Sequence, residues 1–463
     1  MTAPAPHPPG DLGVVERFAG GRPCVQLKLV DAGDLYAMWR WEHALEAPRV
    51  VAVPRALVQP VLVELDAAVP SPMPGETVRA ALERAMAGPL GDPEREAGLA
   101  ARLAGALVPS RLGAELNVLL ERGLRPHLRI QPSRSLARVP WEALLVDEGR
   151  RMVHEVDVST LPPASVRGAV GRRVSVHDPR GPVVAVLDPL VPGGALAPVL
   201  GTTAPGAAVP ASGAAPAFGD RLPLSADSPG ARAASPVAEV VRRLGARRRG
   251  TEPAVGGVID RDRLRALLAD ASRLLYVGHV SSGGHGLDAR LHLSDDARVP
   301  GRAAPMGGHR PLSAADLAFG ATDAAPWRFP ARVALVACES GGDARFAEPA
   351  GLVAVMVRLG AEHVTAARWT LPTDAGFAAV AHDRASASAS ASASASAPAS
   401  GPFSAAVAAV DAAHEAADPV AAVCAWQRAQ AEAWSRDGAP EHSPLIWAAL
   451  STAWAPPPAR ASA

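Results

Sequence analysis

Two short apolar runs in this chain each end next to a residue that could take part in nucleophilic catalysis. The run Leu274–Val277 leads through Gly278 to His279, and the run Val333–Ala337 leads to Cys338. A short apolar run bounded by a glycine-containing turn predicts a buried strand of a parallel sheet. Reacting groups collect at the carboxyl ends of parallel strands, so the imidazole and the thiol could lie side by side there. The imidazole could then take the thiol proton, and the thiolate could attack a carbonyl carbon.

Other chemistries for the same residues fit the sequence less well. A single cysteine at the end of a strand is usually an inert core residue, and it is the pairing with a histidine that favours catalysis. The set His279, His285, His292 and Cys338 contains good zinc ligands, but its spacing matches no compact zinc motif. The glycines 278 and 283 have the spacing of a phosphate-binding loop, yet Gly284 stands where that loop requires lysine. We therefore expect no metal and no cofactor.

The composition narrows the class of protein. The 463 residues suit two or three domains, and 46 basic residues balance 46 acidic ones. This balance argues against nucleic acid or an anionic membrane as a partner, and the arginines at 242–249 fit a solvated face better than a nucleic-acid contact. Three scattered cysteines, no secretory signal and no apolar run long enough to span a membrane predict a cytoplasmic protein.

The chain divides into two predicted parts. Residues 1–92 predict a small accessory α+β module, and residues 93–460 predict the main domain. Within the main domain, 190–232 is rich in Pro, Gly and Ala and predicts a long loop or linker. Residues 385–400 alternate Ala and Ser and predict a disordered insertion. Elsewhere strands alternate with helices, one of them opened by a capping box of Ser313 and Asp316, which indicates an α/β sandwich with a mainly parallel sheet.

Several short motifs resemble the CHAT domain family. The motifs are Val139–Leu144, Leu275-Tyr276-Val277-Gly278-His279, Val336-Ala337-Cys338-Glu339-Ser340-Gly341 and Ser443–Ala448. They occur in the family's order between residues 95 and 455, and Ala-Cys-Glu-Ser-Gly is the most specific. CHAT domains are related to caspases and separases, and His279 precedes Cys338 at nearly the caspase separation. The resemblance implies a caspase-like three-layer sandwich, a bacterial source, and a His–Cys dyad that cleaves peptide bonds.

The resemblance also assigns roles to single residues. Cys338 would be the nucleophile, His279 the general base and acid, and the backbone N–H groups of Val280 and Cys338 would form the oxyanion hole. The family usually has glycine directly after the histidine, and Val280 resists a positive φ, so we expect a rearranged turn or impaired catalysis. His285-Gly286 is a local match to that pattern, but it lies beyond the strand end, and we prefer His279.

Acidic residues near the predicted cleft could receive a basic side chain of the substrate, as in several relatives. The candidates are Glu339 and Asp374, with Asp295 and Asp296 as weaker ones, although Asp374 after Thr373 could instead serve a helix N-terminus.

Two functions remain open. One is a cysteine endopeptidase acting on a protein or peptide substrate, latent until a regulatory protein partner or a ligand arrives, in bacterial defence or another form of regulated proteolysis. The other is a catalytically impaired CHAT pseudoenzyme that serves as an interaction scaffold. Val280 favours the scaffold, and the presence of both dyad residues favours the peptidase.

Overall fold

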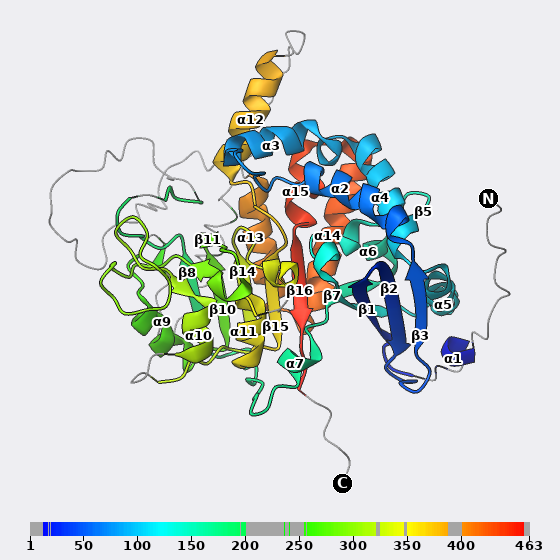
Figure 1. Ribbon diagram of the computed structural model, residues 1–463, viewed down its shortest axis with the longest axis horizontal. Helices are drawn as coiled ribbons and strands as arrows, with labels where there is room; N and C mark the ends of the chain where they lie inside the picture. Colours follow the sequence, from blue (N-terminus) through cyan, green and yellow to red (C-terminus); the bar gives the residue numbers. More distant parts are fainter. Residues whose placement is uncertain are drawn as a thin grey trace, which may run out of the picture.

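The computed structural model describes residues 13–16, 18, 20–194, 196–200, 236, 240, 254–255, 257–320, 325–346, 350–387 and 401–457. An 11-stranded sheet crosses the molecule in the order β3-β2-β1-β4-β7-β16-β15-β14-β10-β8-β9 (Figure 1). The bounds of its strands are β1 Cys24–Ala32, β2 Asp34–Trp41, β3 Arg49–Val53, β4 His127–Gln131, β7 Asp157–Thr160, β8 Val183–Leu187, β9 Ala254–Val255, β10 Arg273–Val277, β14 Arg332–Val336, β15 His363–Ala367 and β16 Leu450–Trp454.

Most neighbouring strands run parallel. β8, β10, β14 and β15 are parallel to one another, so their carboxyl ends share one edge of the sheet. β16 is antiparallel to β15 and parallel to β7, so the direction reverses there. The predicted mainly parallel sheet is therefore confirmed.

Helices cover both faces of the sheet, which makes the three-layer sandwich. In β10, Leu274 and Tyr276 pack in one apolar cluster, while Leu275 and Val277 pack in the other. The first cluster is closed by α9 (Arg261–Leu268), α10 (Ala314–Phe319) and α11 (Leu352–Arg358), and the second by α13 (Pro402–Ala413) and α15 (Pro444–Trp447). The second cluster continues under α2 (Arg55–Ala68), α4 (Pro93–Leu107) and α5 (Ser110–Glu121). Every residue of β10, β14 and β15 is buried, as continuous apolar runs in parallel sheets usually are.

Local signals set where these helices begin. The Asp260 carboxylate accepts from the Arg263 N–H at the start of α9. Ser313 and Asp316 form the predicted capping box of α10, which is confirmed. These caps fix the helices that pack against β10 and β14.

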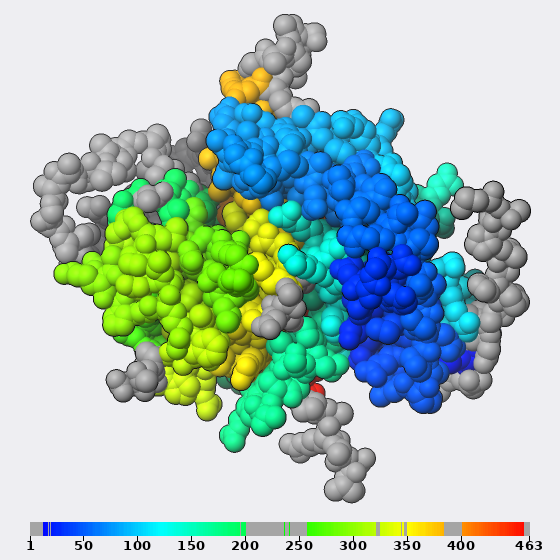
Figure 2. Space-filling model, viewed as in Figure 1, coloured from blue at the N-terminus to red at the C-terminus, as the bar shows by residue number. Residues whose placement is uncertain are grey.

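The N-terminal strands extend the same sheet, because β1 pairs in parallel with β4 from Cys24 to Lys28. Figure 2 shows these blue residues beside the green and yellow half of the chain, with cyan and teal residues between them. The division near residue 92 remains a prediction, although Asp92 does cap the start of α4.

Two predicted segments lie partly outside the described residues. The described part of the 190–232 loop, up to residue 200, contains no helix or strand. The predicted disorder of 385–400 stays a prediction, and α12 (Asp374–Ala387) extends over the first three residues of that segment. Ala and Ser cannot hold a sheet, but Ala is the best helix former and extends a helix that has already begun. Residues 388–400 and the arginines at 242–249 lie outside the described residues.

Within the described ranges, no single helix is both long and apolar enough to cross a membrane. α4 and α5 reach that length only as a pair, and they are bent by 104° relative to each other.

Candidate active site

His279 and Cys338 leave the sheet at the same level. β10 and β14 are parallel neighbours, and Val277 is in register with Val336. His279 and Cys338 each follow two residues later, and both are partly exposed. The register thus brings the predicted imidazole and thiol to one edge of the sheet, from adjacent strands.

The backbone at His279 is held tightly by its neighbours. The buried Tyr276 hydroxyl lies 2.8 Å from the His279 carbonyl oxygen and 3.0 Å from that of His292. The His292 N–H also donates to the His279 carbonyl, at 3.1 Å. A Cβ at Gly278 would lie 3.0 Å from the Tyr276 hydroxyl and 3.1 Å from Pro189, so a side chain has little room there. This packing fixes the direction in which the imidazole leaves the strand.

The His279 imidazole is oriented by a backbone carbonyl. Its Nε2 lies 2.7 Å from the carbonyl oxygen of Ala197. Because a carbonyl only accepts, Nε2 must carry the hydrogen, and Nδ1 of the neutral ring is left as an acceptor. Nδ1 is then the atom that could take a proton from a thiol. A base oriented by a third group is the arrangement that activated nucleophiles use.

Asp188 holds the segment that supplies this carbonyl. It follows β8 directly and has φ 52°, one of two positive φ values at non-glycine residues in the described chain. Its N–H donates to Val277 at 2.7 Å, and its carboxylate accepts from the N–H groups of Val199 at 3.2 Å and Leu200 at 3.3 Å. Asp188 therefore ties the Ala197 segment to the end of the His279 strand.

The Cys338 thiol contacts a backbone carbonyl and not the His279 imidazole. Its Sγ lies 3.7 Å from the Leu371 carbonyl oxygen, and among the described residues no hydrogen bond joins it to His279. Burial raises the pKa of the thiol, and the neighbouring Glu339 carboxylate raises it further. The thiol is therefore protonated at neutral pH and needs a base before it can attack.

The turn after Cys338 is locked by Glu339. This residue has φ 51°, a strained backbone conformation for a glutamate. Its carboxylate binds Arg345 at 2.8 Å, Ser71 at 2.8 Å and Arg138 at 3.4 Å. Burial opposes ionisation, but Arg345, Ser71 and Arg138 hold the pKa of Glu339 below its ordinary value. The Ser282 hydroxyl also donates to this carboxylate, at 3.3 Å, so four separate segments converge on the residue next to Cys338.

We expect Glu339→Gln to make Cys338 more reactive and the protein less stable. Loss of the carboxylate removes a charge that raises the thiol pKa, so alkylation by iodoacetamide at pH 7.5 should rise by up to about tenfold. Arg345 loses its carboxylate partner and Arg138 keeps only Asp66, which should lower the free energy of unfolding by about 1–3 kcal/mol. The control is Glu64→Gln, which removes an exposed ion pair with Arg102 and should change neither quantity. Slower alkylation in Glu339→Gln would contradict this electrostatic account.

The next two residues complete the turn. The Ser340 hydroxyl donates to the Leu335 carbonyl at 2.9 Å and accepts from the Ala367 N–H at 3.0 Å. A Cβ at Gly341 would lie 3.2 Å from the Ala367 carbonyl oxygen. In the Cys-Glu-Ser-Gly motif, Glu339 thus forms ion pairs and Ser340 bridges β14 and β15 through its hydroxyl. Gly341 packs closely against β15.

The two amide groups predicted for the oxyanion hole follow the adjacent strands β10 and β14, and their role stays a prediction. Val280 lies in β11 (Val280–Ser281), opposite Leu291 of β12 (Arg290–Leu291). The His292-to-His279 bond beside this pair makes it a non-hydrogen-bonded pair, so the Val280 N–H points away from β12. Val280 has no positive φ, so the turn does not take the conformation that valine resists. The Cys338 N–H donates to no backbone carbonyl within the described part of the chain.

The acidic residues that were candidates for substrate binding have partners within the protein. The Asp374 carboxylate accepts from the N–H groups of Phe403 at 2.8 Å and Ser404 at 3.1 Å, so it caps α13. Asp295 is buried against Arg261 at 2.9 Å, and Asp296 pairs with Arg298. Like Glu339, these acids are engaged in this structure, and a role in binding substrate stays a prediction.

His285 and His292, which were weighed as metal ligands, belong to no metal-binding group in the described part of the chain. His285 is exposed in the turn before η4 (Gly286–Asp288). His292 Nδ1 lies 2.8 Å from His309 Nε2, and burial together with His309 lowers the pKa of His292 to about 4. Among the described residues, no three His, Cys, Asp or Glu side chains are grouped so that they could hold a metal ion.

Asp343 links the turn after Cys338 to the start of α11. It lies in η5 (Gly342–Arg345), and its carboxylate accepts from the Ala354 N–H in α11 at 2.6 Å. A Cβ at Gly351 would lie 2.2 Å from Asp343 Oδ1, so only glycine fits there. Burial raises the pKa of Asp343 from 3.8 to about 6.

Asp343→Asn should stabilise the protein at neutral pH. Between pH 4 and 6 the folded Asp343 keeps a proton that the unfolded chain has lost, so its contribution to the free energy of unfolding falls as the pH rises. Asparagine keeps an acceptor oxygen and has no charge to bury, so its advantage should grow from near zero at pH 4 to about 1–3 kcal/mol above pH 7. Urea unfolding at several pH values measures this. The exposed Asp262→Asn is the control, and a difference between Asp343→Asn and wild type that does not change with pH would contradict the prediction.

Sequence reasoning missed three contributors to the site. Ala197 acts through its backbone carbonyl, which leaves no side-chain signal. Asp188 follows an apolar run, Val183–Leu187, in the same way as His279 and Cys338, and that signal could have identified it. Tyr276 belongs to the apolar run before His279, but only the structure shows that its hydroxyl donates to the His279 carbonyl.

Comparisons with known proteins complete the picture. Two crystal structures of the Saccharomyces cerevisiae separase–securin complex, at 2.6 and 3.0 angstrom resolution, align with 11% sequence identity and TM-scores of 0.42. The alignments cover 93% and 94% of this chain, which spans 30% of the length of the separase-complex chain. No curated protein sequence matches this chain. The family model of the CHAT domain matches residues 98–397, and the chain therefore belongs to the CHAT domain family.

Proposed function

We propose that this protein is a cysteine endopeptidase in which Cys338 attacks a peptide bond and His279 moves the protons. The observation that carries the proposal is the bond between His279 Nε2 and the Ala197 carbonyl. It sets the tautomer that a general base needs and leaves Nδ1 ready to accept. The parallel register supplies the second requirement, because it places the thiol at the same edge of the sheet.

The proposed reaction follows from these atoms. Nδ1 takes the Cys338 proton, and the thiolate forms a bond to the peptide carbonyl carbon. The negative charge on the carbonyl oxygen would be stabilised by the N–H groups of Val280 and Cys338. Nδ1 then gives its proton to the leaving amine, and the peptide bond breaks to leave a thioester. Water, deprotonated by His279, hydrolyses the thioester and restores the thiol.

We also propose that the described conformation is a latent one. The thiol donates to Leu371 and has a raised pKa, so it must turn away from that carbonyl before it can meet His279. The contacts of the Glu339 carboxylate hold the same turn through residues from four segments. A regulatory protein that displaces one of these segments would release the turn.

The test compares the full-length wild-type chain with Cys338→Ala. Both are treated with an acyloxymethyl ketone peptide library and with a protein library, and labelling and cleavage are read by mass spectrometry. We expect labelling and cleavage that depend on Cys338. Cys24→Ala, which removes the other partly exposed cysteine, is the matched control and should be labelled like wild type. Equal labelling and cleavage by Cys338→Ala would reject the peptidase and leave the scaffold function.

A further inference from the structure

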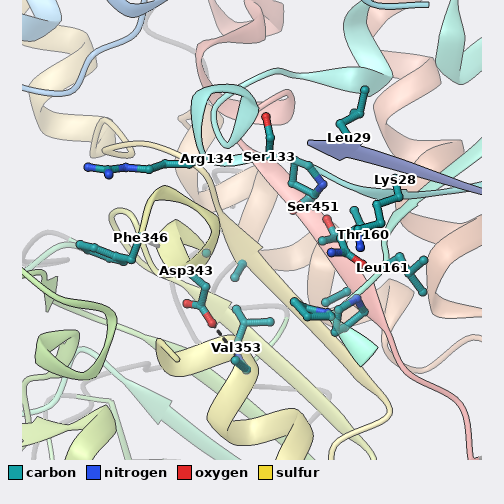
Figure 3. A pocket seen from close by; sticks show the side chains of 18 of the residues that line it. Lys28, Leu29, Ser133, Arg134, Thr160, Leu161, Asp343, Phe346, Val353 and Ser451 are labelled. Atoms are coloured by element: carbon teal, nitrogen blue, oxygen red, sulfur yellow. Dashed lines mark hydrogen bonds between the residues drawn. The ribbon is translucent and has the colours of Figure 1, made fainter. Parts of the chain in front are cut away.

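A large pocket lies on the sheet beside the segment that follows Cys338, because Gly341 and Asp343 belong to its lining. Its volume is about 460 Å³, within the range of small-molecule sites. Small side chains of β15 and β16 form its floor, among them Val364, Ala366 and Ala453. Phe346 and the turn after β7 form apolar walls (Figure 3). We call this the sheet pocket.

Two cations stand at the sheet pocket. Lys28, the only lysine in the chain, extends from β1 towards Thr160 and Ser451, and Arg134 extends on the side of Phe346 (Figure 3). Within the described ranges neither cation has an acidic partner, although most other arginines at this surface are paired. An unpaired cation beside an apolar wall is suited to an anionic group attached to an apolar body.

The acidic groups at the pocket are already compensated. The Asp31 carboxylate accepts from the N–H of Ser135 at 3.1 Å and from its hydroxyl at 2.7 Å. The Asp343 carboxylate faces the backbone N–H groups at the start of α11. The two carboxylates thus have hydrogen-bond donors of their own, which leaves the N–H groups of Lys28 and Arg134 as the donors at the pocket that have no acidic partner among the described residues.

A second hollow adjoins the sheet pocket and shares Asp31 and Arg134 with it. Its volume is about 560 Å³. Four arginines and two aspartates line it, namely Arg55, Arg134, Arg138, Arg345, Asp31 and Asp66. We call it the arginine hollow. The excess of arginine over aspartate favours phosphate or carboxylate, which guanidinium binds in a bidentate manner.

We propose that the sheet pocket and the arginine hollow together bind a small amphipathic organic anion. Its apolar ring or chain would lie on the floor formed by β15 and β16. Its phosphate or carboxylate would lie at Arg134 in the arginine hollow, with Lys28 attracting a further negative or polar group. The site contains neither His279 nor Cys338, so the proposal stands independently of the peptidase function.

The position of the site gives such a ligand access to the catalytic turn. Arg138 lies one turn after Arg134 in the chain, and Arg345 directly precedes Phe346. The guanidinium groups of Arg138 and Arg345 both bind Glu339. The two segments that form the mouth of the site are therefore the ones that hold the residue next to Cys338.

Binding can be tested with 8-anilinonaphthalene-1-sulfonate, an aryl anion whose fluorescence rises in apolar sites. We expect saturable binding to the folded wild-type chain, displaced at least about tenfold more effectively by 1-naphthyl phosphate or 1-naphthoate than by uncharged 1-naphthol or inorganic phosphate alone. The more effective of the two anions distinguishes a phosphate ligand from a carboxylate one. Equal displacement by 1-naphthol would overturn the proposal, because the cations would then contribute nothing.

Variants locate the bound probe. Arg134→Ala and Lys28→Ala should each weaken binding severalfold, and Ser451→Phe should weaken it by filling the sheet pocket. Arg180→Ala, at an exposed arginine elsewhere, is the matched control and should bind as wild type. Circular dichroism confirms that each variant is folded, and any variant that fails is replaced by Thr160→Phe, which fills the same pocket. Wild-type binding by folded Arg134→Ala together with a folded pocket-filling variant would overturn the proposal.

Discussion

His279→Gln should lower the rate at which an electrophilic peptide probe labels Cys338 by about 10²–10⁴-fold, the range in which a general base contributes. Glutamine can still donate an N–H to the Ala197 carbonyl, so the strand end and the Ala197 segment should keep their places. It has no basic nitrogen, however, and cannot take the thiol proton. The thiol, whose pKa is raised by burial, would then depend on hydroxide. Labelling is measured by intact mass as a second-order rate constant from pH 6 to pH 10.

The control for this prediction is His285→Gln, because His285 belongs to the same glycine-rich segment and is exposed. It should be labelled at the wild-type rate at every pH. In His279→Gln, the labelling rate should keep rising with pH and approach the wild-type rate only in alkaline solution. Labelling of His279→Gln at the wild-type rate at pH 7 would mean that the imidazole is not the base.

The placement of His279 and Cys338 at one edge of the sheet was predictable because strands and turns have recognisable local sequence patterns. The apolar runs before His279 and Cys338 specify β10 and β14, and a parallel sheet brings their carboxyl ends together. Likewise, Ser313 and Asp316 predicted a cap that the structure contains. In each case a few neighbouring residues determine the outcome.

The rest depended on contacts between distant segments. The partners of Glu339 come from residues 71, 138, 282 and 345, and nothing near Glu339 in the sequence indicates that its carboxylate binds them. Asp374 was considered for substrate binding, but it caps a helix that begins 28 residues later, across a segment whose length hides the relation. The continuous sheet from β3 to β9 was hidden for the same reason, since β1 pairs with a strand about a hundred residues away.

We infer that Asp188 is a positioning residue, and its substitution should have the second large effect. Asp188→Gly removes the carboxylate that holds the N–H groups of Val199 and Leu200, while glycine tolerates the φ of 52°. The Ala197 carbonyl should then lose its place, and the His279 ring should lose the bond that sets its tautomer. We expect labelling of Cys338 to slow by about 10–100-fold, as misplacement of a catalytic group commonly causes.

Rescue separates positioning from a general loss of structure. Asp188→Asn keeps one acceptor oxygen and also tolerates a positive φ, so it should recover a substantial part of the labelling rate that Asp188→Gly loses. Reversible binding of a non-electrophilic analogue of the probe should be similar in all three proteins, because Asp188 acts on His279 and not on the peptide. If Asp188→Asn and Asp188→Gly were equally slow, the carboxylate contacts to Val199 and Leu200 could not be what orients the base. If both were as fast as wild type, the Ala197 carbonyl would not be needed, and the tautomer of His279 would have to be set by its contacts with β10 and β12 alone.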